Sequence, residues 1–256
     1  MQKLEKNFLI VNVSDNKENY SQRNNTYIHT NSKGIVDVKA GTMCNVTSIC
    51  QALDYNGWKF PDLGAFKQPE DALANFIMTS PAVDAFYKQK MPSLYKDYKA
   101  QKVKNGKPDY YTPNELHLCL AYGTNLWLGC TNAVTFKENC KIWDIFNELI
   151  EGRACVISGQ FNGLGHIVTL VGARWQFPEA TKLNLTQRLD SIIKNKILPT
   201  SVIIDDPYGN FRKNYAAGNS GNDIIMTIDE FFKMIKPLNN HSVKWCQIIK
   251  TGAALV

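Results

Sequence analysis

The sequence predicts an α+β fold in which a helical N-terminal half packs on an antiparallel sheet from the C-terminal half. Near residue 152 the spacing of apolar residues changes from a helical period to short β-branched runs. Helices that precede strands, rather than alternating with them, are typical of segregated layers. We therefore expect one domain over residues 1–256, with its helical part at about 40–152 and its sheet part at about 153–256.

Capping signals and apolar spacing place the helices. One helix is expected to begin at or just before Cys44 and to run towards Gly57, a common stop residue. Another opens at Gln68, where acidic residues fill the first turn. Thr112 begins a Thr-Pro-Asn-Glu capping box ahead of an apolar run. Apolar spacing predicts two more helices, over 138–150 and, as an insert with a basic outer face, over 180–196.

Short β-branched runs bounded by Gly, Asp and Pro predict the strands. They lie at 154–157, 167–171, 201–204 and 243–249. The polar, Asn-rich stretch 14–39 is expected to be irregular. The middle of the chain, 58–141, contains no motif of known function.

Composition is that of an ordinary globular protein, with 44% apolar and 20% charged residues. The net charge of +6 is mild. It suits a polyanionic surface such as cell wall, membrane or nucleic acid without selecting one of them, and a solvated basic surface without a partner fits at least as well. The Lys- and Tyr-rich stretch 88–107 is interpreted as a solvated face, so no nucleic-acid partner is expected. Nothing in the sequence predicts the oligomeric state.

No signal peptide or transmembrane segment is predicted, because the apolar run 8–13 is short and is interrupted at Asn12. We expect synthesis in the cytoplasm, with release to the cell wall through a separate pore if the protein acts there. The seven cysteines form no zinc or disulfide framework, and His117 and Cys119 face different sides of a helix. Neither a metal nor an organic cofactor is therefore expected.

Cys44 stands apart from the other cysteines because it lies at the expected start of a helix. The partial positive charge of a helix N-terminus favours the thiolate, which is the nucleophilic form of cysteine. Taken alone, a cysteine in this position is more often a buried, inert core residue.

A histidine and two aspartates lie where a base and its orienting group are expected. His166 follows a glycine-rich turn and opens a buried strand, a rigid position that still faces a cleft. Asp205 and Asp206 end the next strand, before Pro-Tyr-Gly, where a carboxylate accepts the imidazole N–H. Each segment alone also fits a structural role, but their order along the chain is that of a Cys-His-Asp triad.

These segments resemble the double-glycine-type peptidases of the papain superfamily, especially stand-alone members common in phages and bacteria. The matching pieces are Cys-Asn-Val-Thr-Ser, Gly-His-Ile-Val and Asp-Asp-Pro-Tyr-Gly-Asn, which begin at Cys44, Gly165 and Asp205. The resemblance implies a papain-like fold with Cys44 as nucleophile, His166 as base and Asp206, directly before the proline, as orienter. Asp205 is the alternative orienter.

The same resemblance implies an oxyanion-hole glutamine upstream of the nucleophile, and Gln22 is the best match. Gln22 lies farther from Cys44 than in the processing peptidases, and Asn45 replaces a glycine often found after the nucleophile. A side-chain amide there would stabilise an oxyanion together with the Cys44 backbone N–H.

The resemblance implies a thiol peptidase, and the leading hypothesis is an endolysin-like hydrolase of peptidoglycan peptides. The alternatives are an intracellular peptidase of Gly-rich or leader peptides, and a catalytically inactive papain-like domain that binds peptides. An acyltransferase or deamidase remains open, because the triad does not decide whether water or an amine resolves the thioester.

Overall fold

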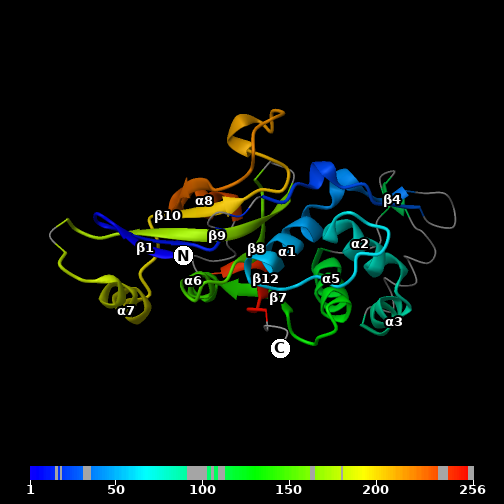
Figure 1. Cartoon of the computed structure of the whole chain (residues 1–256), viewed down its shortest axis with the longest axis horizontal. Helices are drawn as coiled ribbons and strands as arrows, with labels where there is room; N and C mark the ends of the chain where they lie inside the picture. The colour runs from blue at the N-terminus through cyan, green and yellow to red at the C-terminus, as the bar shows by residue number, and fades with distance from the viewer. Residues whose placement is uncertain are drawn as a thin grey trace.

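An eight-stranded antiparallel sheet with helices on both faces forms the body of the protein (Figure 1). The computed structural model describes residues 1–14, 17, 19–30, 36–90, 103–104, 107–108, 113–161, 165–179, 181–235 and 242–252. The strands of the main sheet are β1 (Gln2–Glu5), β2 (Phe8–Asn12), β7 (Val134–Lys141), β8 (Cys155–Gly159), β9 (His166–Gln176), β10 (Ser201–Asp205), β11 (Ile224–Thr227) and β12 (Ser242–Ile249). Their order is β1-β2-β9-β8-β12-β7, and β10 pairs with both β9 and β11.

Strand β9 organises this sheet because it is paired along both edges. Its first half pairs with β8 and its second half with β2, while β10 pairs with residues 169–174. Since β10 overlaps both partners along β9, β8 and β2 share one edge and β10 occupies the other. Alternate side chains of β9 enter opposite cores, Val168 and Leu170 on one face and Ile167 and Val171 on the other.

Two layers of helices cover the two faces of the sheet. One layer, at the right of Figure 1, contains α1 (Cys44–Tyr55), α2 (Pro69–Thr79), α3 (Pro81–Lys90) and α5 (Pro113–Trp127). The other core is closed by α6 (Ile142–Ile150), α7 (Leu185–Asn195) and α8 (Ile228–Ile235). Short 3-10 turns η1 (Gln22–Asn24), η2 (Ala40–Thr42) and η3 (Phe211–Lys213), and two-stranded ribbons β3 (Ile28–Thr30) with β4 (Val36–Lys39) and β5 (Val103–Lys104) with β6 (Lys107–Pro108), complete the described elements.

The predicted α+β class is confirmed, but the sheet is not confined to the C-terminal half. Strands β1 and β2 come from the first 12 residues, and β7 comes from the predicted helical part. The helix expected from residue 138 begins instead at Ile142, because Glu138 lies in edge strand β7, whose polar side chains face solvent. The short apolar run interrupted at Asn12 is the buried strand β2, and the stretch 14–39 contains η1, β3 and β4.

The other predicted helices and strands lie close to their expected positions. Helix α1 ends at Tyr55, two residues before Gly57, and α5 begins at Pro113 of the capping box. The insert forms α7 with an Asn184 capping box. Most of the stretch 88–107 lies outside the described residues.

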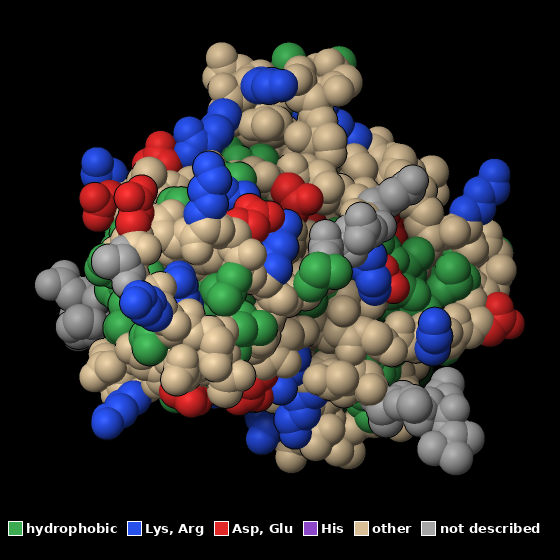
Figure 2. Space-filling view, turned by 60° about the vertical axis from the view of Figure 1, so that its left-hand side comes forward, with side chains coloured by type: hydrophobic (Ala, Val, Ile, Leu, Met, Phe, Trp, Pro, Cys, Tyr) green, Lys and Arg blue, Asp and Glu red, His purple; other side chains and the backbone are tan. Residues whose placement is uncertain are grey.

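Charge is dispersed over the face seen in Figure 2, which turns the left-hand end of Figure 1 forward. Lys and Arg side chains are scattered among Asp and Glu on this face and do not gather into one patch. Within the described residues, none of the helices has both the length and the apolar character needed to cross a bilayer.

Asn56, the C-cap residue of α1, joins this helix to two strands of the sheet. Its buried side chain accepts a hydrogen bond from the Ala154 N–H and donates to the carbonyls of Ala154 and Ile249, at 2.7, 3.1 and 2.8 Å. An Asn56→Ala substitution leaves buried backbone groups unpaired, so we expect a loss of about 3 kcal/mol in the free energy of unfolding, measured by urea denaturation. Asn195→Ala, which removes an exposed amide on α7, is the control and is expected to change it by less than ~0.5 kcal/mol. Equal effects of the two substitutions would contradict this role of Asn56.

Candidate active site

Cys44 is the first residue of α1, and its side chain is partly exposed. No side chain caps this helix at Met43, although Asn45 Oδ1 accepts a hydrogen bond from the Val46 N–H at 2.8 Å. The other amides of the first turn therefore keep their partial positive charge at the sulfur end of the helix. This position is the one expected from the sequence.

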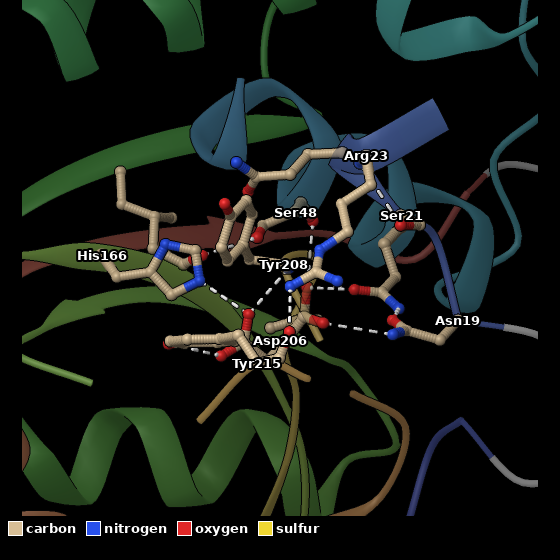
Figure 3. A network of polar contacts seen from close by, with 12 residues as sticks. Asn19, Ser21, Arg23, Ser48, His166, Asp206, Tyr208 and Tyr215 are labelled. Atoms are coloured by element: carbon tan, nitrogen blue, oxygen red, sulfur yellow. Dashed lines mark hydrogen bonds and ion pairs between the residues drawn. The ribbon is translucent and has the colours of Figure 1, made fainter. Parts of the chain in front are cut away.

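His166 opens β9 and lies between two polar partners. Gly165 precedes it with a φ of +87°, a conformation that favours glycine and turns the chain into the strand. The imidazole is buried, and its Nε2 lies 2.6 Å from Asp206 Oδ1 (Figure 3). Gly163 and Leu164 of the predicted turn lie outside the described residues.

The charge state of His166 is set by competition between burial and its neighbours. Burial, the largest single effect, lowers the pKa of His166 because it disfavours the charged ring. Hydrogen bonds with Asp206 and with the Cys44 side chain, and the charges of both groups, together outweigh burial and raise the pKa to about 9. The ring is therefore an imidazolium at neutral pH, placed between a carboxyl group and a sulfur.

Asp206, rather than Asp205, contacts the imidazole. Its Oδ1 also accepts the Tyr208 N–H at 2.8 Å, and its Oδ2 accepts the Tyr215 hydroxyl at 3.3 Å. Three donors thus hold a fully buried carboxyl group in one orientation. Side-chain position therefore favours Asp206 for the orienting role, as the resemblance implies.

Asp205 faces the opposite way and binds α1. Its carboxyl group accepts the Tyr55 hydroxyl at 2.9 Å, the Gln51 amide at 3.4 Å and the Asp223 N–H at 2.7 Å. Burial, the largest effect, raises the pKa of Asp205 to about 7. Gln51 Oε1 in turn accepts the Thr169 hydroxyl of β9 at 2.8 Å. This buried network joins the helix that carries Cys44 to β9, which begins at His166, and to β10, which ends directly before Asp206.

Aromatic rings surround the His–Asp pair. Tyr208 and Tyr215 both stand edge-on to the His166 ring, with centroids 6.4 and 6.3 Å away. Arg23 lies over the Tyr208 ring, 4.5 Å from its centroid, and donates to the Tyr215 carbonyl at 2.6 Å (Figure 3). These contacts shield His166 and Asp206 from water. The backbone of Tyr215 has a positive φ of 55°.

Gln22 is buried in η1 and contacts the segment before Cys44 and the segment after Asp206. Its backbone N–H donates to the Pro207 carbonyl at 2.9 Å, and its Nε2 donates to the Gly41 carbonyl at 3.0 Å. Gly41 belongs to η2, which directly precedes α1. The side-chain amide therefore lies next to the segment that enters the Cys44 helix.

The arrangement joins the imidazole of His166 to the Asp206 carboxyl group and places both near the Cys44 side chain at the start of α1. Such a set can carry out acyl transfer on sulfur. Among the described residues, no group of three or more His, Cys, Asp or Glu side chains is placed to hold a metal ion.

Comparisons with known proteins give little further information. No protein-family model matches the sequence, and no curated protein matches it. Among solved structures, the chain is similar to a Bacillus anthracis protein provisionally described as a C39-like peptidase, with a TM-score of 0.46 and 15% identity over 95% of this chain and 99% of that chain. A likeness at this level decides neither the fold nor the function.

Sequence patterns missed the residues that support the site. Tyr208 belongs to the Asp-Asp-Pro-Tyr-Gly segment, and its position beside the aspartates was a signal for it. Arg23, Tyr55 and Tyr215 carry no local signal, because their roles arise only from contacts distant in the sequence.

The contacts of His166 predict the effect of removing its carboxyl partner. In Asp206→Asn the opposite charge is lost while burial remains, so the pKa of His166 is expected to fall by about 2 units. NMR titration of the His166 ring measures this value directly. Asp190→Asn, an exposed change on α7, is the control and is expected to leave the titration unchanged. An unaltered midpoint in Asp206→Asn would contradict the assigned cause.

Proposed function

We propose that this protein is a cysteine peptidase that hydrolyses an amide bond through a thioester on Cys44. The observation that carries the proposal is the 2.6 Å contact between His166 and Asp206, with the Cys44 side chain among the groups that raise the pKa of the same imidazole. A positive charge next to the sulfur and a helix N-terminus behind it are the two features that activate a cysteine.

In the proposed mechanism Cys44 attacks as a thiolate and His166 acts first as an acid. The sulfur bonds to the substrate carbonyl carbon, the C–N bond breaks, and the leaving nitrogen takes the proton from His166. Neutral His166 then accepts a proton from a water whose oxygen attacks the thioester. The carboxylic acid leaves, and the thiolate and imidazolium are restored.

Asp206 and Gln22 have supporting roles in this mechanism. Asp206 holds the imidazole in one orientation and stabilises its positive charge. The Gln22 side-chain amide and the Cys44 backbone N–H are the proposed oxyanion donors, since Gln22 is fixed beside the segment that leads into α1.

For the substrate we propose a peptide of bacterial peptidoglycan. The net charge of +6 supports this choice, because a basic protein is attracted to an anionic wall. An intracellular peptidase acting on Gly-rich or leader peptides is the second candidate and uses the same residues.

Selective alkylation tests the activated thiol. With limiting iodoacetamide at neutral pH, Cys44 is expected to react at least ~10 times faster than Cys130, the other partly exposed cysteine, whose sulfur lies against the Asn125 side-chain amide. Peptide mapping by mass spectrometry measures both rates in one sample. The preference is expected to disappear in His166→Ala. Equal labelling of the two cysteines in the native protein would favour an inactive, peptide-binding domain.

Lysis of permeabilised bacteria tests the proposed substrate separately. Purified protein is expected to reduce the turbidity of permeabilised bacteria, and Cys44→Ala is expected to lose at least ~1000-fold of this activity. Mass analysis of the released fragments distinguishes hydrolysis from acyl transfer. An activated Cys44 together with no loss of turbidity across several wall types would exclude peptidoglycan and leave the intracellular substrates.

A further inference from the structure

Arg23 is an exposed cation close to the paired side chains of His166 and Asp206. It belongs to η1, which also contacts the segment before Cys44. The Tyr208 ring stands between Arg23 and His166 (Figure 3), with its centre 4.5 Å from the guanidinium carbon and 6.4 Å from the imidazole centre. The guanidinium is therefore at most about 11 Å from the imidazole, a distance that an extended peptide covers in roughly three residues.

Contacts at both ends of Arg23 hold the residue in one place. Its backbone N–H donates to Ser21 Oγ at 3.3 Å, and its guanidinium lies over the Tyr208 ring and donates to the Tyr215 carbonyl at 2.6 Å. An arginine has five N–H donors, and among the described residues the Tyr215 carbonyl is the only acceptor that the guanidinium meets. A fixed and exposed guanidinium with further donors loses little freedom when it binds an anion.

No acid neutralises this guanidinium within the described part of the chain. By contrast, Arg153 and Arg212 each pair with a glutamate, at 2.6 and 2.7 Å. The carboxyl group of Asp206 is fully buried and is engaged by His166. The planar fork of a guanidinium matches the two oxygens of a carboxylate, so an exposed arginine without an acidic partner is suited to bind one from another molecule.

The place of Arg23 relative to His166 indicates which part of a substrate it meets. In the proposed mechanism the leaving nitrogen takes its proton from His166, so the leaving part of the substrate passes beside this ring. Tyr208 and Tyr215 both stand edge-on to the same ring, and Arg23 contacts both of them. The first few residues after the scissile bond therefore come within reach of the guanidinium.

We propose that Arg23 is a specificity-determining residue that binds a carboxylate in the leaving part of the substrate, within about three residues of the scissile bond. The proposal rests on the proposed peptidase function. The N–H groups that Tyr215 does not use donate to the carboxylate oxygens, and the Tyr208 ring holds the guanidinium in position for them. The substrate class is thus a peptide that is acidic after the cleaved bond.

Matched alkylating probes test this role. The probes are iodoacetyl-tripeptide amides, whose chain runs from the reactive carbon in the same direction as the leaving part of a substrate. One of the three positions carries Asp or its isostere Asn, with Gly at the others. Mass spectrometry gives the rate of Cys44 modification, divided by the rate with iodoacetamide for the same protein. At one position the Asp probe is expected to react about fivefold faster than the Asn probe, and high salt is expected to reduce this ratio by screening.

Charge-matched variants assign the preference to Arg23. Arg23→Gln removes the cation and is expected to bring the Asp-to-Asn ratio close to one. Arg23→Lys keeps the charge without the planar fork, so it is expected to give an intermediate ratio and serves if Arg23→Gln does not fold. Lys194→Gln removes the same charge from an exposed position on α7 and is the control, expected to keep the native ratio.

The outcomes separate this proposal from the proposed function. Selective alkylation of Cys44 by iodoacetamide, with equal rates for Asp and Asn at all three positions, would overturn the role of Arg23 and leave the peptidase standing. A preference for Asp that persists in Arg23→Gln, or that falls equally in Lys194→Gln, would place its origin elsewhere or in the net charge and would also overturn it. Failure of iodoacetamide to select Cys44 would instead contradict the proposed function.

Discussion

The pairing of β9 along both edges is the constraint on which the rest of the structure depends. This strand is held by β8 and β2 on one side and by β10 on the other, and both of its faces are buried. His166 is its first residue, so the proposed base is attached to the most extensively hydrogen-bonded segment of the sheet. The proposed site also needs helix α1, which carries Cys44, to lie in the correct place beside this base. The hydrogen bonds that join Asp205 and β9 to α1 fix that position.

Adjacent aspartates have separate roles because consecutive side chains of an extended chain point in opposite directions. Asp205 points to α1 and binds Tyr55 and Gln51, whereas Asp206 points to His166. One dipeptide at the end of β10 thus joins the helix of the proposed nucleophile to the sheet and also contacts the proposed base. A shift of one residue in the β10 register would exchange these directions, so the strand register determines the chemistry of the site.

Two buried histidines show how local charge, rather than burial alone, decides the state of an imidazole. His117 is buried among aromatic rings without a carboxyl partner, and its pKa is lowered to about 4. His166 is similarly buried but contacts Asp206 and Cys44, and its pKa is raised to about 9. The His166 ring is suited to the proposed role of stabilising a negative sulfur and giving a proton to a leaving group.

The sequence by itself determined the α+β class, most helices and strands, and the three segments that carry Cys44, His166 and Asp206. These features depend on local signals, namely capping residues, periodicity and turn glycines, which are readable within about ten residues. The tertiary structure alone decided that Phe8–Asn12 is a central strand, that Glu138 lies in an edge strand, and which of the two aspartates faces the imidazole. It also decided the contacts of Arg23, Tyr55 and Tyr215. Pairing partners and side-chain direction at strand ends depend on residues far apart in the chain, and no local pattern encodes them.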